Sequence, residues 1–235
     1  MSATQTTSGT TCWSCHAATT GEHFCAACGK IQPLPRGADY FQFFGLPRKL
    51  WIDAGALEAN FHKLSWKLHP DNFVRASESE RELSLERSSQ LNDAYRALRD
   101  PVARVEYLLE IEGMRKEGTT KQQAPPELLE EVFELNEWLD ELRTARESPS
   151  DSGEVTVLRE RLMEAEKNFE AKLRDVDADL MAAAKDWDAA LDNRTNGDAG
   201  TATQRAHLEK MNEILNRRSY IRNLVANVEK ELAGE

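Results

Sequence analysis

Apolar residues that recur at three- and four-residue steps constrain the fold of this chain more than any other feature of its sequence. Such spacing lines one face of an α-helix. It predicts helical segments at about 54–69, 77–99, 127–147, 154–191 and 203–232, separated by prolines or polar segments. No stretch alternates apolar and polar residues for long enough to indicate a strand. The sequence therefore predicts an all-α protein.

The balance of residue types narrows the classes of function. With 235 residues, of which 40% are hydrophobic, the chain is long enough to bury a core. Its net charge of −11 argues against a protein built mainly to coat nucleic acid or an anionic membrane. No apolar stretch approaches the roughly 18 residues that span a bilayer, and the start has neither a signal-peptide core nor an arginine-rich presequence. We expect protein partners and a cytoplasmic location, or the mitochondrial matrix if the source is eukaryotic.

All the cysteines lie near the start of the chain, as two Cys-x2-Cys pairs. They are Cys12, Cys15, Cys25 and Cys28. Two residues between cysteines let one tight turn aim both sulfurs at a single ion, so the spacing indicates a metal site. Because four thiolates fill a tetrahedral shell, we expect structural zinc that folds a module too small for a core of its own. His16 and His23 lie nearby but are not needed as ligands. A rubredoxin-like iron site, a redox pair and two disulfides are the alternatives.

The segment between the first two predicted helices carries His69, Pro70 and Asp71. Pro70 stiffens this loop, and Asp71 presents a carboxylate at the tip of a helical hairpin. Lys63 and Lys67 stand one turn apart on the preceding helix, away from its apolar seam. Positive charge here, in an acidic chain, favours docking on an acidic protein surface. Taken alone, the tripeptide would indicate no more than a turn.

The predicted helix at 127–147 pairs acidic residues with off-seam apolar groups. Seven acids and no base lie between Glu127 and Glu141. Leu129 and Phe133 fall roughly 100° to 140° from the apolar seam of the helix. Tyr220 likewise points away from the buried side of the last helix. From the pattern alone this is either a solvated acidic face at the margin of a core or a protein interface.

Several segments together resemble a J-domain. They are Leu-His-Pro-Asp at 68–71, Leu-Asn-Asp-Ala-Tyr-Arg-Ala-Leu at 91–98 and Asp-Pro at 100–101. The segments at 39–47 and 104–109 narrow the resemblance to the HscB type, the J-type co-chaperones of iron–sulfur cluster biogenesis. The cysteine pairs resemble the zinc-bearing version of that family. One departure is Asn72, where many J-domains carry lysine.

The resemblance implies a fold and a set of functional residues. It implies a tetracysteine zinc module and hinge at 1–37, a helical-hairpin J-domain at 38–113, and a C-terminal three-helix bundle at 114–235. His69, Pro70 and Asp71 would stimulate ATP hydrolysis by a DnaK- or HscA-type chaperone, with Lys63 and Lys67 in the docking helix. The bundle would bind an IscU-type iron–sulfur scaffold protein. The residues implied for that surface are Leu129, Glu130, Phe133, Glu134, Glu137, Glu141 and Tyr220; Glu130 stands where an apolar residue is often found.

The implied protein is an adaptor and not an enzyme, since the ATP site belongs to the partner chaperone. We find no Walker-type phosphate loop and no persuasive nucleophile–histidine constellation in the sequence. Two alternatives stay open at this point. One is a general J-domain co-chaperone of protein folding, and the other is a zinc, redox or nucleic-acid-binding protein that acts through the cysteine module.

Overall fold

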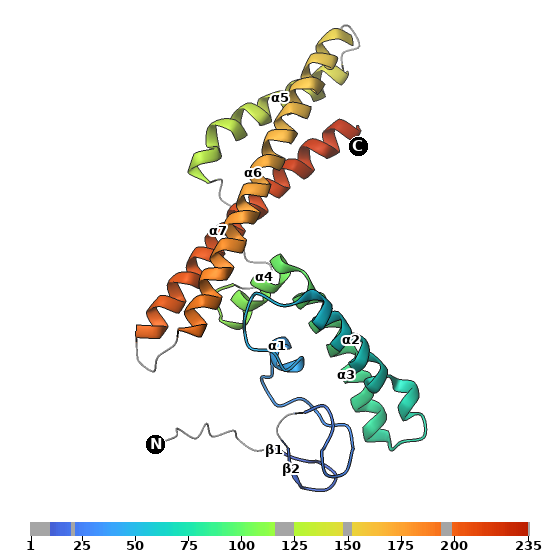
Figure 1. Ribbon diagram of the computed structural model, residues 1–235. Helices are drawn as coiled ribbons and strands as arrows, with labels where there is room; N and C mark the ends of the chain where they lie inside the picture. The colour runs from blue at the N-terminus through green and yellow to red at the C-terminus, as the bar shows by residue number, and fades with distance from the viewer. Residues whose placement is uncertain (1–9, 20–21, 116–124, 148–151, 194–198, 235) are drawn as a thin grey trace. The chain divides into compact units, whose positions relative to one another are not determined.

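The computed structural model describes residues 10–19, 22–115, 125–147, 152–193 and 199–234, and the expected all-α fold is confirmed (Figure 1). Two compact units are present, Met1–Tyr107 and Leu108–Glu235. The three-part division expected from the sequence stays a prediction, with the cysteine pairs and the hairpin both inside the first unit. Within the described residues, every helix is too short or too polar to span a lipid bilayer.

The first unit begins with a small ribbon and continues into short helices. Strand β1 (Thr10–Thr11) pairs antiparallel with β2 (Ala18–Thr19). Helix α1 (Tyr40–Phe43) begins at Asp39, whose carboxylate accepts a hydrogen bond from the backbone N–H of Gln42 at 2.8 Å. These elements are too short to leave a periodic signal, so the sequence pattern predicts none of them.

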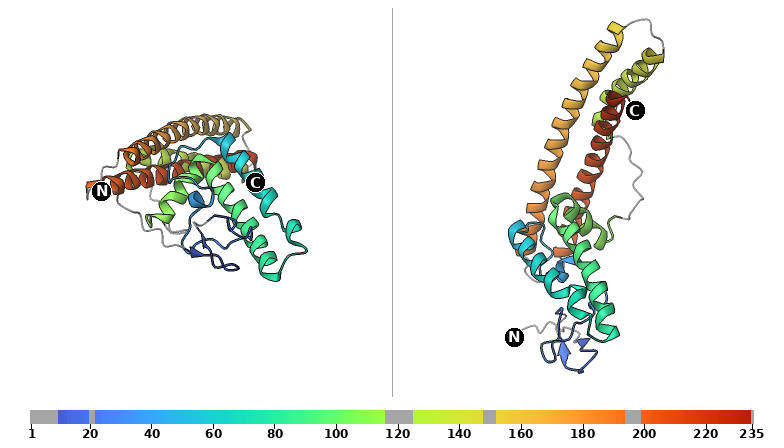
Figure 2. Two further views of the ribbon diagram at one scale, coloured as in Figure 1. Left: turned by 60° about the horizontal axis from the view of Figure 1, so that its bottom comes forward. Right: turned by 90° about the vertical axis from the view of Figure 1, so that its right-hand side faces the viewer.

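A helical hairpin follows these short elements in the first unit (Figures 1 and 2). It consists of α2 (Ala54–Leu68), the 3-10 turn η1 (Pro70–Phe73) and α3 (Glu78–Arg99). Asp53 caps α2, and a capping box of Ser77 and Glu80 starts α3. The buried seam between the two helices contains Leu57, Leu64, Leu68, Leu91, Ala94 and Leu98.

Helix α4 (Pro101–Ile111) follows α3 directly. Asp100 accepts a hydrogen bond from the backbone N–H of Ala103, and proline suits the first position of a helix, so the Asp-Pro pair ends one helix and starts the next. Arg104, 4% exposed, donates to the backbone carbonyls of Leu98 and Leu50. The helix therefore fastens the end of α3 to the loop before α2.

The second unit contains the three long helices that the sequence predicts. The turn η2 (Pro126–Leu128) leads into α5 (Leu129–Glu147), followed by α6 (Ser152–Asp192) and α7 (Ala199–Ala233). Helices α6 and α7 lie side by side, and α5 packs on α6. The predicted polar breaks include 116–124, 148–151 and 194–198, which lie outside the described residues. The buried seam includes Leu135, Leu139, Leu142, Leu162, Phe169, Leu180, Trp187, Met211, Leu215, Ile221 and Val228.

Candidate functional site

The four cysteines converge in the structure. Their sulfur atoms all lie within 4.8 Å of one another, and Sγ of Cys12 lies 3.7 Å from Sγ of Cys28, as does Sγ of Cys15 from Sγ of Cys25. Thiolates bound to one zinc ion at about 2.3 Å would stand about 3.8 Å apart along a tetrahedral edge. A disulfide requires about 2.05 Å. The donor set and spacing therefore fit one metal ion and do not fit two disulfides.

The backbone of the first pair favours a thiolate. The N–H groups of Ser14 and Cys15 both donate to Sγ of Cys12 at 3.4 Å. Burial raises the pKa of the Cys12 thiol, but these hydrogen bonds, together with those from the side chains of Cys15 and Cys28, outweigh burial and bring the pKa down to about 6. Since the thiolate is the form that ligates metals, the turn prepares Cys12 as a ligand.

His23 is not part of the cysteine cluster; it joins the cysteine module to the hairpin. Arg87 Nη2 lies 2.5 Å from His23 Nδ1, and His23 Nε2 lies 3.0 Å from the backbone oxygen of Phe43. Because a guanidinium can only donate, Nδ1 accepts and Nε2 carries the proton that bonds Phe43. Burial, together with the charge of Arg87, lowers the pKa of His23 to about 4, which keeps the ring neutral at pH 7.

A second contact between module and hairpin is ionic. Lys30 Nζ, directly after the second cysteine pair, lies 2.7 Å from Glu80 Oε2 on α3. Sequence patterns alone miss both contacts. Arg87 and Glu80 are nevertheless visible as charged residues at seam positions of α3, and charged seam positions indicate that a polar partner must meet the helix there.

The predicted chaperone-binding loop is exposed at the tip of the hairpin. The side chain of Asp71 is 84% exposed and that of His69 is 55% exposed. His69 Nδ1 accepts a hydrogen bond from the backbone N–H of Asp71 at 3.3 Å, and Pro70 begins η1. Asn72 Nδ2 donates to the backbone carbonyl of Trp66 at 2.6 Å. The loop is thus folded back on the end of α2 while its carboxylate faces solvent.

Helix α2 brings the two predicted lysines to the surface beside an aromatic group. Lys63 and Lys67 are both exposed. Trp66, three positions after Lys63 and next to Lys67, is 79% exposed. A large apolar ring beside two cations is typical of a protein contact surface. Periodicity identifies Trp66 only as an off-seam residue.

The side chains predicted to bind a scaffold are accessible on the second unit. Phe133 is 66% exposed, Leu129 is 54% exposed, and Tyr220 on α7 is half-buried. The remaining predicted residues are exposed along α5: Glu130, Glu134, Glu137 and Glu141.

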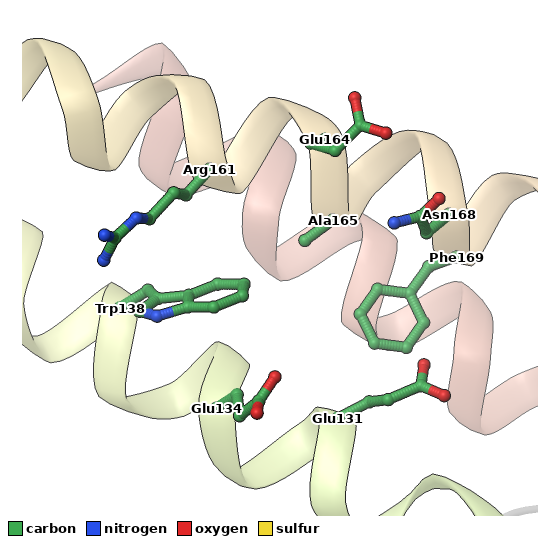
Figure 3. Close-up of a pocket in the computed structure, with 8 residues that line it drawn as sticks. All are labelled: Glu131, Glu134, Trp138, Arg161, Glu164, Ala165, Asn168 and Phe169. Atoms are coloured by element: carbon green, nitrogen blue, oxygen red, sulfur yellow. The ribbon is translucent and has the colours of Figure 1, made fainter.

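These residues do not form one line on α5, because successive residues of a helix are about 100° apart. Leu129 lies on the side of α5 that is turned toward α7. Arg143, within about 40° of Leu129 around the helix, marks that side, because it pairs with Glu231 of α7 at 2.5 Å. Glu134 instead lines a groove of about 250 Å³ between α5 and α6 (Figure 3). The predicted surface therefore wraps around the outer side of α5.

The groove combines apolar walls with charged edges. The rings of Trp138 and Phe169 point into the space between the helices, near Ala165 (Figure 3). The charged and polar residues that line it are Glu131, Glu134, Glu164, Arg161 and Asn168. Carboxylates outnumber bases here, and Glu131 is held by Lys172 at 3.0 Å. An apolar side chain flanked by basic residues would fit such a groove.

Comparison with known proteins identifies the class. The chain is 38% identical over 142 residues to the co-chaperone protein HscB homologue of Aliivibrio salmonicida, covering 57% of this chain and 82% of that protein. It is 36% identical over 154 residues to the HscB homologue of Azoarcus sp., covering 66% of this chain and 82% of that protein. No family model matches the chain.

Solved structures agree with the sequence relatives. The crystal structure of human co-chaperone protein HscB matches with a TM-score of 0.64 and 24% identity, over 94% of this chain and 98% of that one. Chaperone HscB from Vibrio cholerae matches with a TM-score of 0.55 and 26% identity, over 82% of this chain and 96% of that one. The relatives and the fold thus define a co-chaperone. The chain belongs to the HscB co-chaperone family, which confirms the resemblance found in its sequence.

Proposed function

We propose that this protein is an adaptor of iron–sulfur cluster assembly, which binds an IscU-type scaffold on its C-terminal bundle and stimulates the ATPase of a DnaK- or HscA-type chaperone. The observation that carries the proposal is the exposure of two chemically opposite surfaces on a member of the HscB family. One surface is basic and includes Asp71 at a hairpin tip, and the other is acidic with exposed Leu129 and Phe133.

The chaperone-binding surface consists of Lys63, Lys67 and the loop of His69, Pro70 and Asp71. Cations on a rigid helix attract an acidic partner and orient it on approach. The loop then presents the Asp71 carboxylate in a fixed place, since His69 and Asn72 tie both sides of it to the local backbone. ATP hydrolysis takes place in the chaperone, and no residue of this chain takes part in bond chemistry.

The scaffold-binding surface consists of Leu129, Glu130, Phe133, Glu134, Glu137, Glu141 and Tyr220. Exposed aromatic groups supply most of the affinity in such an interface, and the surrounding carboxylates select a basic partner. The neighbouring groove between α5 and α6 gives the same partner a place to insert an apolar side chain. Because the surface is broad, its affinity for the scaffold is spread over several contacts.

Zinc is the ion that best fits the cysteine cluster, and Cys12, Cys15, Cys25 and Cys28 would hold it. Four thiolates leave no open position for a catalytic water, so the ion supplies folding free energy, on the order of 10 to 16 kcal/mol for structural sites. The cluster thus stabilises the fold of residues 12–28 and the contacts that this segment makes with the hairpin.

The two surfaces act together because they belong to one molecule. A scaffold bound to the bundle is brought to the chaperone at a high effective concentration, which converts two modest affinities into one strong capture. The outcome is delivery of the scaffold as the chaperone hydrolyses ATP.

Simultaneous capture tests the proposal. An IscU-type scaffold is immobilised, and a DnaK-type chaperone is added with ATP in the presence or absence of this protein. We expect the chaperone to be retained only when the protein is present, and its ATPase rate to rise. Binding of the scaffold and the chaperone in mutually exclusive fashion would contradict the adaptor function.

A further inference from the structure

The base of the His-Pro-Asp loop is anchored to α3. Leu68 is the last residue of α2, where backbone carbonyls lack partners within the helix. The hydroxyls of Ser84 and Ser88, one turn apart on α3, both donate to the Leu68 carbonyl, at 2.7 and 2.9 Å. Leu68 and Ser84 are fully buried. The loop therefore starts from a point that α3 fixes.

The same stretch of α3 is held by the cysteine module. Lys30 of the module bonds Glu80, four residues before Ser84, and His23 bonds Arg87, three residues after it. This spacing places Glu80, Ser84 and Arg87 along one face of the helix. Residues that contact the module thus alternate with residues that hold the base of the loop.

Burial of Arg87 is not expected to stabilise the fold by itself. It is 1% exposed, yet its Nε and Nη1 atoms have no hydrogen-bond partner among the described residues. Its remaining contacts are His23 and the face of the Phe43 ring, 4.7 Å from the guanidinium carbon. A buried cation with unsatisfied donors is costly, whereas an apolar residue of similar size would pack without that cost. We therefore infer that Arg87 serves to fix the position of the module on α3.

We propose that the cysteine module positions the His-Pro-Asp loop. Lys30 and His23 hold Glu80 and Arg87 on the same face of α3 as Ser84 and Ser88, which anchor the base of the loop. The inference rests on the proposed function in that the loop is the chaperone contact. Arg87 and Glu80 are then positioning residues, which act on the chaperone through the placement of Asp71. The module would affect chaperone stimulation without touching the chaperone.

The test uses the full chain with zinc bound and two variants that cut the links separately. Lys30→Ala removes the partly exposed ionic contact with Glu80, and Arg87→Met removes the buried cation while it keeps the volume. The matched control is Arg96→Ala, since Arg96 lies on the same helix and is 75% exposed in its pair with Asp93. Lys30→Arg is the conservative variant that should restore the contact.

Three quantities are measured for each variant: the maximal stimulation of chaperone ATPase, the hydrogen exchange of backbone amides at 71–74, and the affinity for the scaffold. We expect Arg87→Met to lower maximal stimulation about fivefold or more, because small misplacements of a contacting group cost large factors in rate. Exchange at 71–74 should quicken about tenfold as the base of the loop loosens. Lys30→Ala should move both readouts in the same direction, while Lys30→Arg, Arg96→Ala and scaffold affinity stay at the wild-type level.

Unchanged exchange at 71–74 in both Lys30→Ala and Arg87→Met would overturn the inference. Global unfolding of Arg87→Met would leave the decision to Lys30→Ala, which removes no buried group. If the wild-type protein does not stimulate the chaperone ATPase, the proposed function is refuted instead. The exchange experiment would still decide whether the module positions the loop.

Discussion

The two units bury different kinds of residue. The first unit buries Gln32, Asp39, Glu80, Ser84, Arg87 and Arg104, whereas Asp188 is the corresponding residue of the second unit within the described ranges. In the first unit these side chains tie together segments that lie far apart in the sequence, such as His23 and Arg87. The second unit instead has a continuous apolar seam, and its ion pairs lie mainly at the surface.

The two units should therefore respond differently to substitution. Individual polar atoms fix positions in the first unit, so the loss of one contact displaces a particular group. Many similar apolar contacts hold the second unit, so the loss of one lowers stability by a graded amount. The proposed binding surfaces follow the same division, with a compact loop on the first unit and a broad face on the second. Four variants test this difference between the units.

Replacement of all four cysteines by serine should have the largest effect. Because the module has too little core to fold alone, the variant should lose its zinc and the order of residues 12–28, with a metal contribution on the order of 10 kcal/mol removed. The helices of the second unit should persist, since their seam is independent of the module. Metal analysis together with circular dichroism measures both outcomes. One retained equivalent of zinc would contradict the four-thiolate site.

Asp71→Ala should abolish stimulation of the chaperone ATPase at nearly unchanged stability. The side chain is 84% exposed, and exposed substitutions usually alter unfolding free energy by no more than about 0.5 kcal/mol. Steady-state ATP hydrolysis and thermal unfolding are the measurements. Glu82→Ala, which removes another exposed carboxylate from the hairpin, serves as the control. Undiminished stimulation by Asp71→Ala would remove this loop from the mechanism.

Phe133→Ala combined with Tyr220→Ala should weaken scaffold binding but leave ATPase stimulation without scaffold unaltered. Truncation of central aromatic contacts costs about 2 kcal/mol or more, which is about thirtyfold in Kd. Calorimetric titration with an IscU-type scaffold gives the affinity, and Val157→Ala removes a different exposed apolar side chain as the control. Equal affinity of the double variant and the wild type would move the interface elsewhere.

Arg143→Ala should have the smallest effect. Arg143 bonds Glu231 through Nε and Nη2 at 2.9 and 2.5 Å, but its own side chain is 55% exposed, so solvent screening keeps the contribution of the pair to stability small. The hydrogen bond from Arg143 lowers the pKa of Glu231. The contribution is therefore present above the unfolded pKa of about 4.3 and is lost as pH falls through the folded value. Urea unfolding at pH 7 and pH 3 should show the difference between variant and wild type shrinking in acid; a larger difference at pH 3 would be inconsistent with this pair.

The sequence predicts the second unit well because its helices repeat one physical pattern. The seam residues Leu135, Leu162 and Leu215 follow three- and four-residue steps, and the structure buries each of them. The cysteine spacing likewise predicts the four-sulfur cluster, because each Cys-x2-Cys turn aims its two sulfurs at one point, and the sulfur atoms lie within 4.8 Å of one another. The short helices α1 and α4 are not predicted. Helix α1 has four residues, too few to leave a periodic signal, and Asp100-Pro101 indicates the end of α3 although it is also the start of α4.

Sequence periodicity cannot predict the contacts between the cysteine module and the hairpin. His23 and Arg87 are 64 positions apart, and nothing local in either segment identifies the other. His23 is outside the four-cysteine cluster, as expected, but its contact with Arg87 emerges only in three dimensions. A charged residue at a seam position, such as Arg87 or Glu80, is the available signal that an unseen partner exists.

Mixing two defective proteins tests the adaptor account most directly. Asp71→Ala keeps the scaffold surface, the double variant of Phe133 and Tyr220 keeps the chaperone loop, and the readout is the scaffold-dependent rise in chaperone ATPase rate. If both surfaces must sit on one chain, an equal mixture will lack the rise that the wild type gives. A mixture that restores the full wild-type rise would show that the surfaces work without being joined, and the adaptor account would be wrong.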